Sequence, residues 1–187
     1  MGKIVVTEFI SLDGVIEDPG GAEGYEQGGW SFTFDQGDEG RKFKFDELMA
    51  SDAQLLGRVT YEGFAKAWPS MQDPFGFADK MNAMPKYVVS STLTDPSWNN
   101  TTVLGTAAAA AALKEKYDGD ILVAGSGTLV RGLTDLGLVD EYRLMIFPLI
   151  LGTGKRLFDG AKMTRLKQAG STGIGTDGVA IQRFTPA

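Results

Sequence analysis

Short apolar runs alternate along the chain with longer segments in which apolar and charged residues are mixed. The apolar runs are rich in Val, Ile and Leu, as in 3–10 and 120–124, and are typical of buried strands. The mixed segments predict helices, and six consecutive alanines strengthen this prediction for 106–117. The predicted strands are 3–10, 53–56, 87–90, 101–104, 120–124, 141–150, 162–171 and 179–184, and the predicted helices are 37–51, 59–67, 75–84, 106–117 and 128–136.

The order of these elements predicts the architecture. Strands and helices alternate up to about residue 140, and strands alone follow. This order predicts an α/β fold with three αβα layers, in which a mostly parallel mixed sheet carries antiparallel C-terminal strands at its edge. Neither a repeat nor a linker divides the chain, so we expect residues 1–187 to form one domain. The glycine-rich stretch 18–29 predicts a long mobile loop.

The chain contains no histidine and no cysteine. These absences exclude Ser-His-Asp and Cys-His catalysis, disulfide bonds and most zinc chemistry, and we predict no metal site. Hydride transfer fits the remaining residue types, because an organic cofactor performs the difficult step while the protein supplies binding, orientation and a proton.

Charge and hydropathy narrow the possible partners. The net charge of −6 comes without a basic stripe, which disfavours nucleic acid and anionic membranes. No apolar run reaches the roughly 18 residues of a membrane-spanning helix. The first apolar run contains Glu8 and lacks a signal-peptide cleavage site. We therefore expect a cytoplasmic protein that binds a small molecule.

A glycine motif follows the second predicted strand. In a parallel sheet the carboxyl ends of the strands meet at one edge, where ligands bind. Gly57-Arg58-Val59-Thr60 leads from the strand into a helix, whose first amides favour a phosphate, and Arg58 adds a cation. An ordinary strand-to-helix turn with a surface arginine explains the same residues.

Two further motifs follow other predicted strands. The hydroxyls of Ser90-Ser91 can donate to a phosphate, or they can cap a turn. Gly125-Ser126-Gly127-Thr128 connects a buried strand to a helix, which is what a pyrophosphate site needs. Val130 stands where the dinucleotide fingerprint has its third glycine, so close packing of strand and helix is an alternative reason for the two glycines.

Several motifs occur in a fixed order along the chain. They are Ser11-Leu12-Asp13-Gly14-Val15-Ile16, Gly57-Arg58-x-Thr60-Tyr61, Ser90-Ser91, Gly125-x-Gly127, and Leu138-Val139-Asp140-Glu141 through Pro148-Leu149-x-Leu151-Gly152-x-Gly154. This order resembles the dihydrofolate reductase superfamily. It is most similar to stand-alone proteins related to the reductase domain of the bifunctional riboflavin-biosynthesis deaminase-reductase. The resemblance spans about residues 3–184.

The resemblance implies a dihydrofolate-reductase-like fold and a cofactor, NADPH. It implies that Gly57, Arg58, Val59 and Thr60 hold the adenosine phosphates, with Arg58 near the 2′-phosphate. It places Ser90 and Ser91 at the same end and Ile16 near the nicotinamide. It assigns the pyrophosphate to Gly125, Ser126, Gly127 and Thr128. A homodimer is also reasonable from the family relation.

The substrate side rests on three residues. Trp30 and Asp35 have the spacing that a tryptophan and an acidic residue have in dihydrofolate reductases, where the acid holds the pteridine ring. A buried Asp35 with a raised pKa would be the catalytic acid, and a water is the alternative source of the proton. Alternatively, Trp30 anchors the loop by packing and Asp35 caps the following helix. Asp13 contacts the ligand or belongs to an Asp-Gly turn.

We therefore expect an NADPH-dependent reductase that acts on a pterin-, pyrimidine- or flavin-precursor-like small molecule such as 5-amino-6-(5-phosphoribosylamino)uracil. Two alternatives remain open. One is a non-catalytic nucleotide-binding module with the same phosphate site, and the other is a dimeric scaffold that has the fold without its activity.

Overall fold

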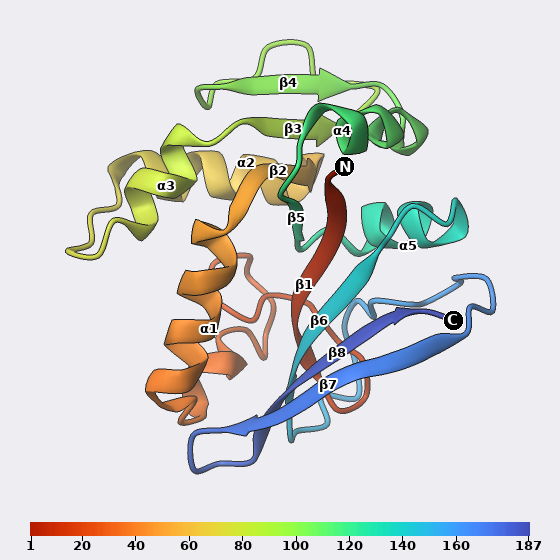
Figure 1. Cartoon of the computed structure of the whole chain (residues 1–187). Coiled ribbons are helices and arrows are strands. Elements are labelled where there is room, and N and C mark those ends of the chain that lie inside the picture. Colours follow the sequence, from red (N-terminus) through yellow and green to blue (C-terminus); the bar gives the residue numbers. More distant parts are fainter.

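The computed structural model describes residues 1–187, and all its strands form one eight-stranded sheet. The strand order is β4-β3-β2-β5-β1-β6-β8-β7 (Figure 1). The strands are β1 (Lys3–Ser11), β2 (Ser51–Gly57), β3 (Lys86–Val89), β4 (Thr101–Leu104), β5 (Asp120–Ala124), β6 (Glu141–Phe147), β7 (Leu166–Ile174) and β8 (Val179–Pro186). The α-helices are α1 (Gly37–Met49), α2 (Arg58–Ala67), α3 (Phe77–Ala83), α4 (Ala111–Lys116) and α5 (Gly127–Asp135), and the 3₁₀ helices are η1 (Trp30–Thr33), η2 (Trp68–Ser70) and η3 (Ala107–Ala110).

Strands β1 to β6 pair in parallel, and β8 and β7 are antiparallel, as the sequence predicts. The central strand β1 lies between β5 and β6 and is buried along most of its length. A strand covered on both faces must be apolar throughout, which explains why 3–10 reads as an almost continuous apolar run.

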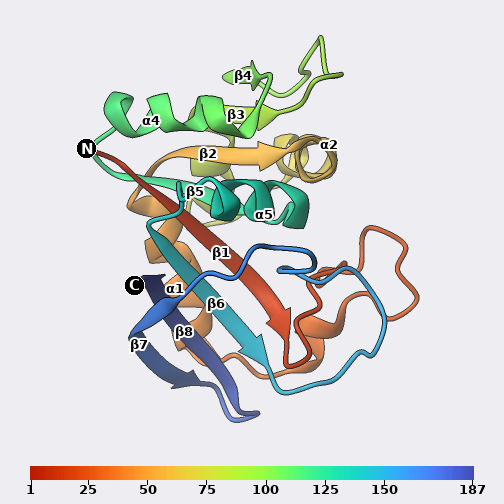
Figure 2. The same ribbon diagram turned by 90° about the vertical axis from the view of Figure 1, so that its right-hand side faces the viewer.

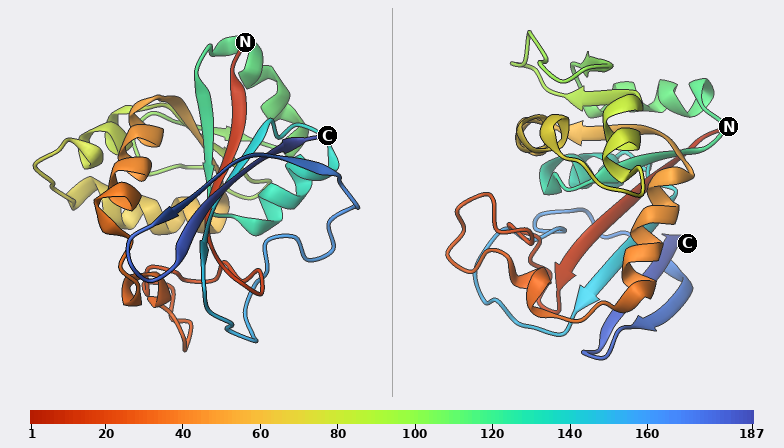
Figure 3. Two further views of the ribbon diagram at one scale, coloured as in Figure 1. Left: turned by 60° about the horizontal axis from the view of Figure 1, so that its bottom comes forward. Right: turned by 90° about the vertical axis from the view of Figure 1, so that its left-hand side faces the viewer.

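Helices cover both faces of the sheet (Figures 1 and 3). On one face, Leu48 of α1 and Tyr61 of α2 pack in a cluster that includes Val5. On the other face, Leu129 and Val130 of α5 pack in a cluster that includes Ile4, Val6 and Ile10. Odd and even positions of β1 thus face opposite helical layers, which is the period of two that a strand imposes.

Several predicted element boundaries are wrong, including the following four. β6 ends at Phe147 rather than 150, because Pro148 has no N–H with which to continue the ladder. The predicted strand 162–171 is displaced to Leu166–Ile174, where it pairs with β8 from Leu166↔Pro186 to Ile174↔Val179. The predicted helix 106–117 is divided into η3 and α4. The second strand begins at Ser51, two residues before the predicted start.

Two long connections lie beyond the carboxyl ends of β1 and β6. Figure 2 shows the β1–α1 connection beside the segment that follows β6, and the Tyr25 hydroxyl donates to the Thr153 carbonyl at 3.0 Å. Within 18–29, which the sequence predicts as a mobile loop, the buried Asp18 carboxylate accepts from the amides of Ala22 and Tyr25. Both chain termini lie at the opposite edge of the sheet (Figure 2). No helix has the length and apolar character that crossing a bilayer requires.

Candidate functional site

The chain leaves the neighbouring strands β1 and β5 toward opposite faces of the sheet. After β1 it continues into α1 on one face, and after β5 it continues into α5 on the other. In open α/β sheets this divergence opens a crevice at the carboxyl ends of the two strands, where ligands bind. The fold therefore directs attention to the loops that follow β1, β5 and the adjacent β2.

One serine joins the loops that follow β2 and β5. The Ser126 hydroxyl accepts a hydrogen bond from the Gly57 amide at 2.8 Å and donates to the Thr60 hydroxyl at 2.7 Å. Ser126 adopts a left-handed backbone with φ of 71°, which is uncommon for a residue with a side chain. Two hydrogen bonds across the junction compensate for this conformation and fix the two loops against each other.

The glycines of both motifs permit this close approach. A Cβ on Gly57 would lie 2.7 Å from the Ser126 Oγ, and one on Gly125 would lie 3.1 Å from the Thr60 side chain. A Cβ on Gly127 would lie 3.1 Å from the Ile16 Cδ1. Close packing therefore explains why glycine occupies these positions, and it brings the two predicted phosphate motifs together.

The two helices that start here present free amide groups. In α5 the Val130 amide donates to the Ser126 carbonyl, so the amides of residues 127–129 precede the first intrahelical hydrogen bond. The amides of residues 58–60 occupy the same place in α2. Two helix N-termini at adjacent strands suit a ligand with separate phosphate groups. These residues therefore fit the phosphates of a dinucleotide cofactor.

Cationic and apolar groups surround the two N-termini. The Arg58 guanidinium is about half exposed and lies 4.0 Å from Glu62, a weak pairing that leaves it free to meet an anion. Arg131, which sequence reasoning missed, donates to the Thr128 hydroxyl at 3.1 Å. The sequence feature that could have identified Arg131 is its position one helical turn after Gly127. Ile16 packs beside Gly127, at the side of the site that faces β1.

Ser90 forms a turn at the end of β3. Its hydroxyl accepts hydrogen bonds from the amides of Thr92 and Leu93 at 3.2 and 3.0 Å, which is the turn-capping alternative. Ser91 is exposed. Both serines lie at the carboxyl edge of the sheet, two strands away from β5.

Trp30 is a packing anchor. Its side chain is 3% exposed, its ring packs edge-on against Phe147 with centroids 5.3 Å apart, and its Nε1 donates to the Glu17 carbonyl at 2.9 Å. Of the two interpretations of Trp30, the structure supports anchoring of the loop.

The predicted environment of Asp35 is wrong. Its carboxylate is exposed, not buried, and accepts hydrogen bonds from the Gly37 amide at 2.9 Å and the Thr176 hydroxyl at 2.9 Å. These hydrogen bonds hold the pKa of Asp35 below its ordinary value, the opposite of the raised pKa that a catalytic acid needs. Asp35 therefore ties the start of α1 to the β7–β8 turn.

Asp13 stabilises a turn between two segments. Its carboxylate accepts hydrogen bonds from Ser11 at 2.7 Å and from the backbone amides of Leu151 and Gly152. The Ser11 hydrogen bond, followed by the amides, lowers the pKa of Asp13 to about 2. Arg156 lies 3.4 Å from the same carboxylate. These contacts agree with the turn interpretation of the Asp-Gly pair.

Glu8 is a buried acidic residue that sequence reasoning did not assign to the site. It lies in β1, is 6% exposed, and its Oε1 has no hydrogen-bond partner. Burial raises the pKa of Glu8 to about 8, against smaller lowering effects from the Lys44 charge and a backbone hydrogen bond from Gly125. The signal in the sequence was a lone acidic residue inside a strand that must be buried on both faces.

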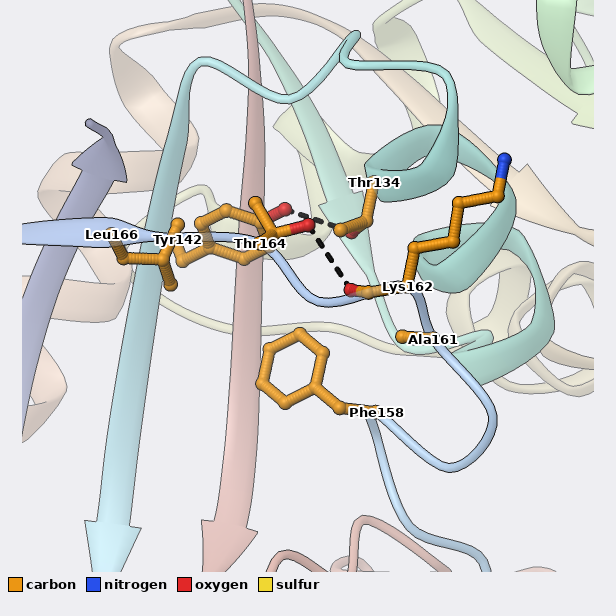
Figure 4. Close-up of a pocket in the computed structure, with 7 residues that line it drawn as sticks. All are labelled: Thr134, Tyr142, Phe158, Ala161, Lys162, Thr164 and Leu166. Carbon is orange, nitrogen blue, oxygen red and sulfur yellow. Dashed lines mark hydrogen bonds between the residues drawn. The ribbon is translucent and has the colours of Figure 1, made fainter.

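Two cavities lie away from this edge. A cavity of about 190 Å³ lies at the far end of α5, where Figure 4 shows Phe158 and Tyr142 beside Thr134. A second, of about 580 Å³, lies between Phe43 of α1 and the β7–β8 hairpin, and Glu39, Lys42 and Arg183 also line it. Neither includes a residue of the glycine motifs.

The comparison with known families identifies the chain. A model of the RibD C-terminal domain matches residues 2–180. The chain belongs to the RibD C-terminal domain family. The uncharacterized protein YyaP of Bacillus subtilis (strain 168) is 29% identical over 167 residues, which cover 86% of this chain and 82% of YyaP. The uncharacterized protein YwjB of the same organism is 28% identical over 177 residues, which cover 92% of each chain.

Solved structures confirm the dihydrofolate-reductase-like fold expected for this family. A protein of Shewanella sp. PV-4 named as a riboflavin biosynthesis protein matches with a TM-score of 0.76 at 19% identity, over 100% of this chain and 99% of that one. Dihydrofolate reductase of Enterococcus faecalis, complexed with NADP(H) and RAB-propyl, matches with a TM-score of 0.63 at 14% identity, over 99% and 96%. A pyrimidine reductase-like protein of Corynebacterium diphtheriae matches with a TM-score of 0.61 at 15% identity, over 100% and 92%. At these identities the likeness concerns the fold.

Proposed function

We propose that this protein is an NADPH-dependent reductase that passes a hydride to a small heterocyclic molecule. The observation that carries the proposal is the junction made by Ser126, which holds the N-termini of α2 and α5 side by side at the carboxyl edge of the sheet. Membership of the RibD C-terminal domain family supports the same activity.

The proposed cofactor position follows from the two helix N-termini. The amides of residues 127–129 would hold the pyrophosphate, and Arg131 would add a positive charge. The amides of residues 58–60 and the half-exposed Arg58 would hold the 2′-phosphate that distinguishes NADPH from NADH. Ile16, packed beside Gly127, would contact the nicotinamide. When bound, NADPH supplies the hydride.

The proposed substrate is a pyrimidine-like heterocycle, such as 5-amino-6-(5-phosphoribosylamino)uracil, or a pterin. Three observations support this class. The family is that of the RibD C-terminal domain, the Corynebacterium structure is named pyrimidine reductase-like, and a dihydrofolate reductase shares the fold.

The test is oxidation of NADPH by the purified protein, followed by absorbance, with 5-amino-6-(5-phosphoribosylamino)uracil, with dihydrofolate and without substrate. We expect substrate-dependent oxidation with one of the two compounds. The matched variant is Gly57→Ala, whose new Cβ would lie 2.7 Å from the Ser126 Oγ, so it should disrupt the junction and reduce turnover. Tight NADPH binding without oxidation by any compound of a wider pterin and pyrimidine panel would contradict the reductase proposal and favour a nucleotide-binding module.

A further inference from the structure

Glu8 is a buried acidic residue at the carboxyl end of the pairing between β1 and β5. The last residue pair between these strands is Thr7↔Ala124, so Glu8 on β1 lies level with Gly125, where the β5–α5 loop begins. The Gly125 backbone lies close enough to the Glu8 carboxyl group to lower its pKa slightly. Glu8 therefore lies where the two strands diverge.

The direction of the Glu8 side chain follows from the alternation along β1. Val6 and Ile10, two residues to either side, both pack in the cluster that contains Leu129 and Val130 of α5. Glu8 shares their face of the sheet. Ile16, which packs against the same cluster, also lies beside Gly127. The carboxyl group is thus on the side of the sheet where α5 presents its free amides.

An unpartnered buried carboxyl oxygen requires an explanation, because leaving a polar atom buried without a hydrogen bond costs stability. Glu8 Oε1 is such an atom. Its neighbours on β1 are apolar on this face and offer no donor or acceptor. A ligand bound at this edge of the sheet, where open α/β sheets bind their ligands, would supply the missing partner.

We propose that Glu8 is the catalytic acid of this site, donating a proton to the C=N or C=O group of the substrate as that group is reduced. The proposal rests on the proposed reductase function. The substrate carbon gains the hydride and forms a C–H bond, and the π electron pair moves to the nitrogen or oxygen. That atom takes the proton from the Glu8 carboxyl group, and water returns a proton to the carboxylate.

The surroundings of Glu8 keep this proton in place at neutral pH. Burial raises its pKa to about 8, so the acid form predominates near pH 7. The charged group that opposes this effect is Lys44 of α1. Lys44 is itself paired with Glu47 at 2.6 Å, and Glu47 lies 3.6 Å from Arg143 of β6. The effect of the Lys44 charge on the pKa of Glu8 is smaller than that of burial.

The relative binding of NADP⁺ and NADPH distinguishes a catalytic acid beside the nicotinamide from a carboxyl group with a structural role. The oxidised ring of NADP⁺ carries a positive charge that the reduced ring lacks, and a nearby cation favours the carboxylate. Ionisation of Glu8 should therefore strengthen NADP⁺ binding relative to NADPH binding. The 2′-phosphate is common to both forms, so its titration cancels in the ratio of the two dissociation constants.

The experiment measures the dissociation constants of NADP⁺ and NADPH by tryptophan fluorescence between pH 6.5 and 9.5, for the wild type and Glu8→Gln. For the wild type we expect the ratio Kd(NADP⁺)/Kd(NADPH) to fall about tenfold across this range, which corresponds to a difference of about one pKa unit between the two complexes. For E8Q, which has no ionisable group at this position, we expect a constant ratio.

A wild-type ratio that does not change with pH would overturn the assignment of Glu8, as would the same change in E8Q. Both outcomes leave NADPH binding, and with it the proposed function, intact. Failure of the wild type to bind either nucleotide would instead overturn the proposed function and the inference that rests on it. If E8Q does not fold, Glu8→Asp replaces it: because the shorter carboxyl titrates in an altered environment, we expect the ratio to fall with a shifted midpoint pH, and a pH dependence identical to that of the wild type would overturn the assignment.

Discussion

The Ser126 hydroxyl accepts a hydrogen bond from the Gly57 amide at 2.8 Å and thereby links the start of α5 to the end of β2. The two residues are 69 positions apart in the sequence. Their contact holds the two glycine motifs, and the N-termini of α2 and α5 that follow them, against each other.

Replacing Ser126 by alanine should destabilise the protein and weaken NADPH binding. The Gly57 amide and the Thr60 hydroxyl would both lose their partner, at a cost of about 1–2 kcal/mol. Urea unfolding measures the stability, and fluorescence titration measures the affinity. Ser126→Gly is the matched control: it also lacks the hydroxyl, but it relieves the left-handed backbone and should lose less stability. Equal stability of S126A and the wild type would show that the junction is dispensable.

Replacing Arg58 by alanine should weaken NADPH binding about tenfold and leave NADH binding nearly unchanged. The expected loss corresponds to one charge-assisted contact, about 1.5 kcal/mol, made only to the 2′-phosphate. Parallel titrations with both nucleotides measure the effect. Arg131→Ala is the control, because Arg131 lies beside Thr128 at the pyrophosphate end and should affect both nucleotides alike. An unchanged preference for NADPH in R58A would contradict the assignment of Arg58.

Replacing Asp35 by alanine should lower stability without affecting NADPH affinity. Its lowered pKa stabilises the fold above the pKa of the unfolded chain, and this stabilisation is lost as the pH falls through the folded pKa. The stability difference between wild type and D35A should therefore be larger at pH 7 than at pH 3, as measured by urea unfolding. Loss of NADPH-dependent turnover in a stably folded D35A would restore Asp35 as the catalytic acid.

Glu8→Gln should change the pH dependence of stability in the direction opposite to that of Asp35→Ala. Folding raises the pKa of Glu8 to about 8. The stability that this shift contributes is therefore fully present below the pKa of the unfolded chain, and it is lost as the pH rises through the pKa of the folded protein. E8Q should thus gain stability relative to the wild type between pH 5 and pH 9, by on the order of 1–3 kcal/mol. Urea unfolding at both pH values measures this, with the exposed Glu115→Gln as the control. A relative stability of E8Q that is the same at both pH values would contradict the burial of an ionisable Glu8.

The sequence predicts the layers of this fold well because burial on both faces imposes apolar runs such as 120–124, which became β5 unchanged. Boundaries that depend on pairing are harder to predict. The position of β7 follows from its register with β8, and no local pattern in 162–171 specifies that register.

The residues of the candidate site also differ in how well the sequence predicts them. Gly57 and Gly125 carry a local signature, so sequence reasoning found them. The environment of Asp35 depends on Thr176, which is 141 residues away, and its exposure could not be predicted from the spacing to Trp30. Glu8 was missed because a single carboxyl in an apolar strand belongs to no motif, and its position level with Gly125 appears only when β1 is paired with β5.

The most direct test of the account is the titration of the purified wild-type protein with NADPH and with NADH, followed by tryptophan fluorescence. The account predicts saturable binding of both, with NADPH at least about tenfold tighter because Arg58 meets the 2′-phosphate. Absence of binding for both nucleotides would contradict it, and the two glycine motifs would then be close-packed turns without a ligand.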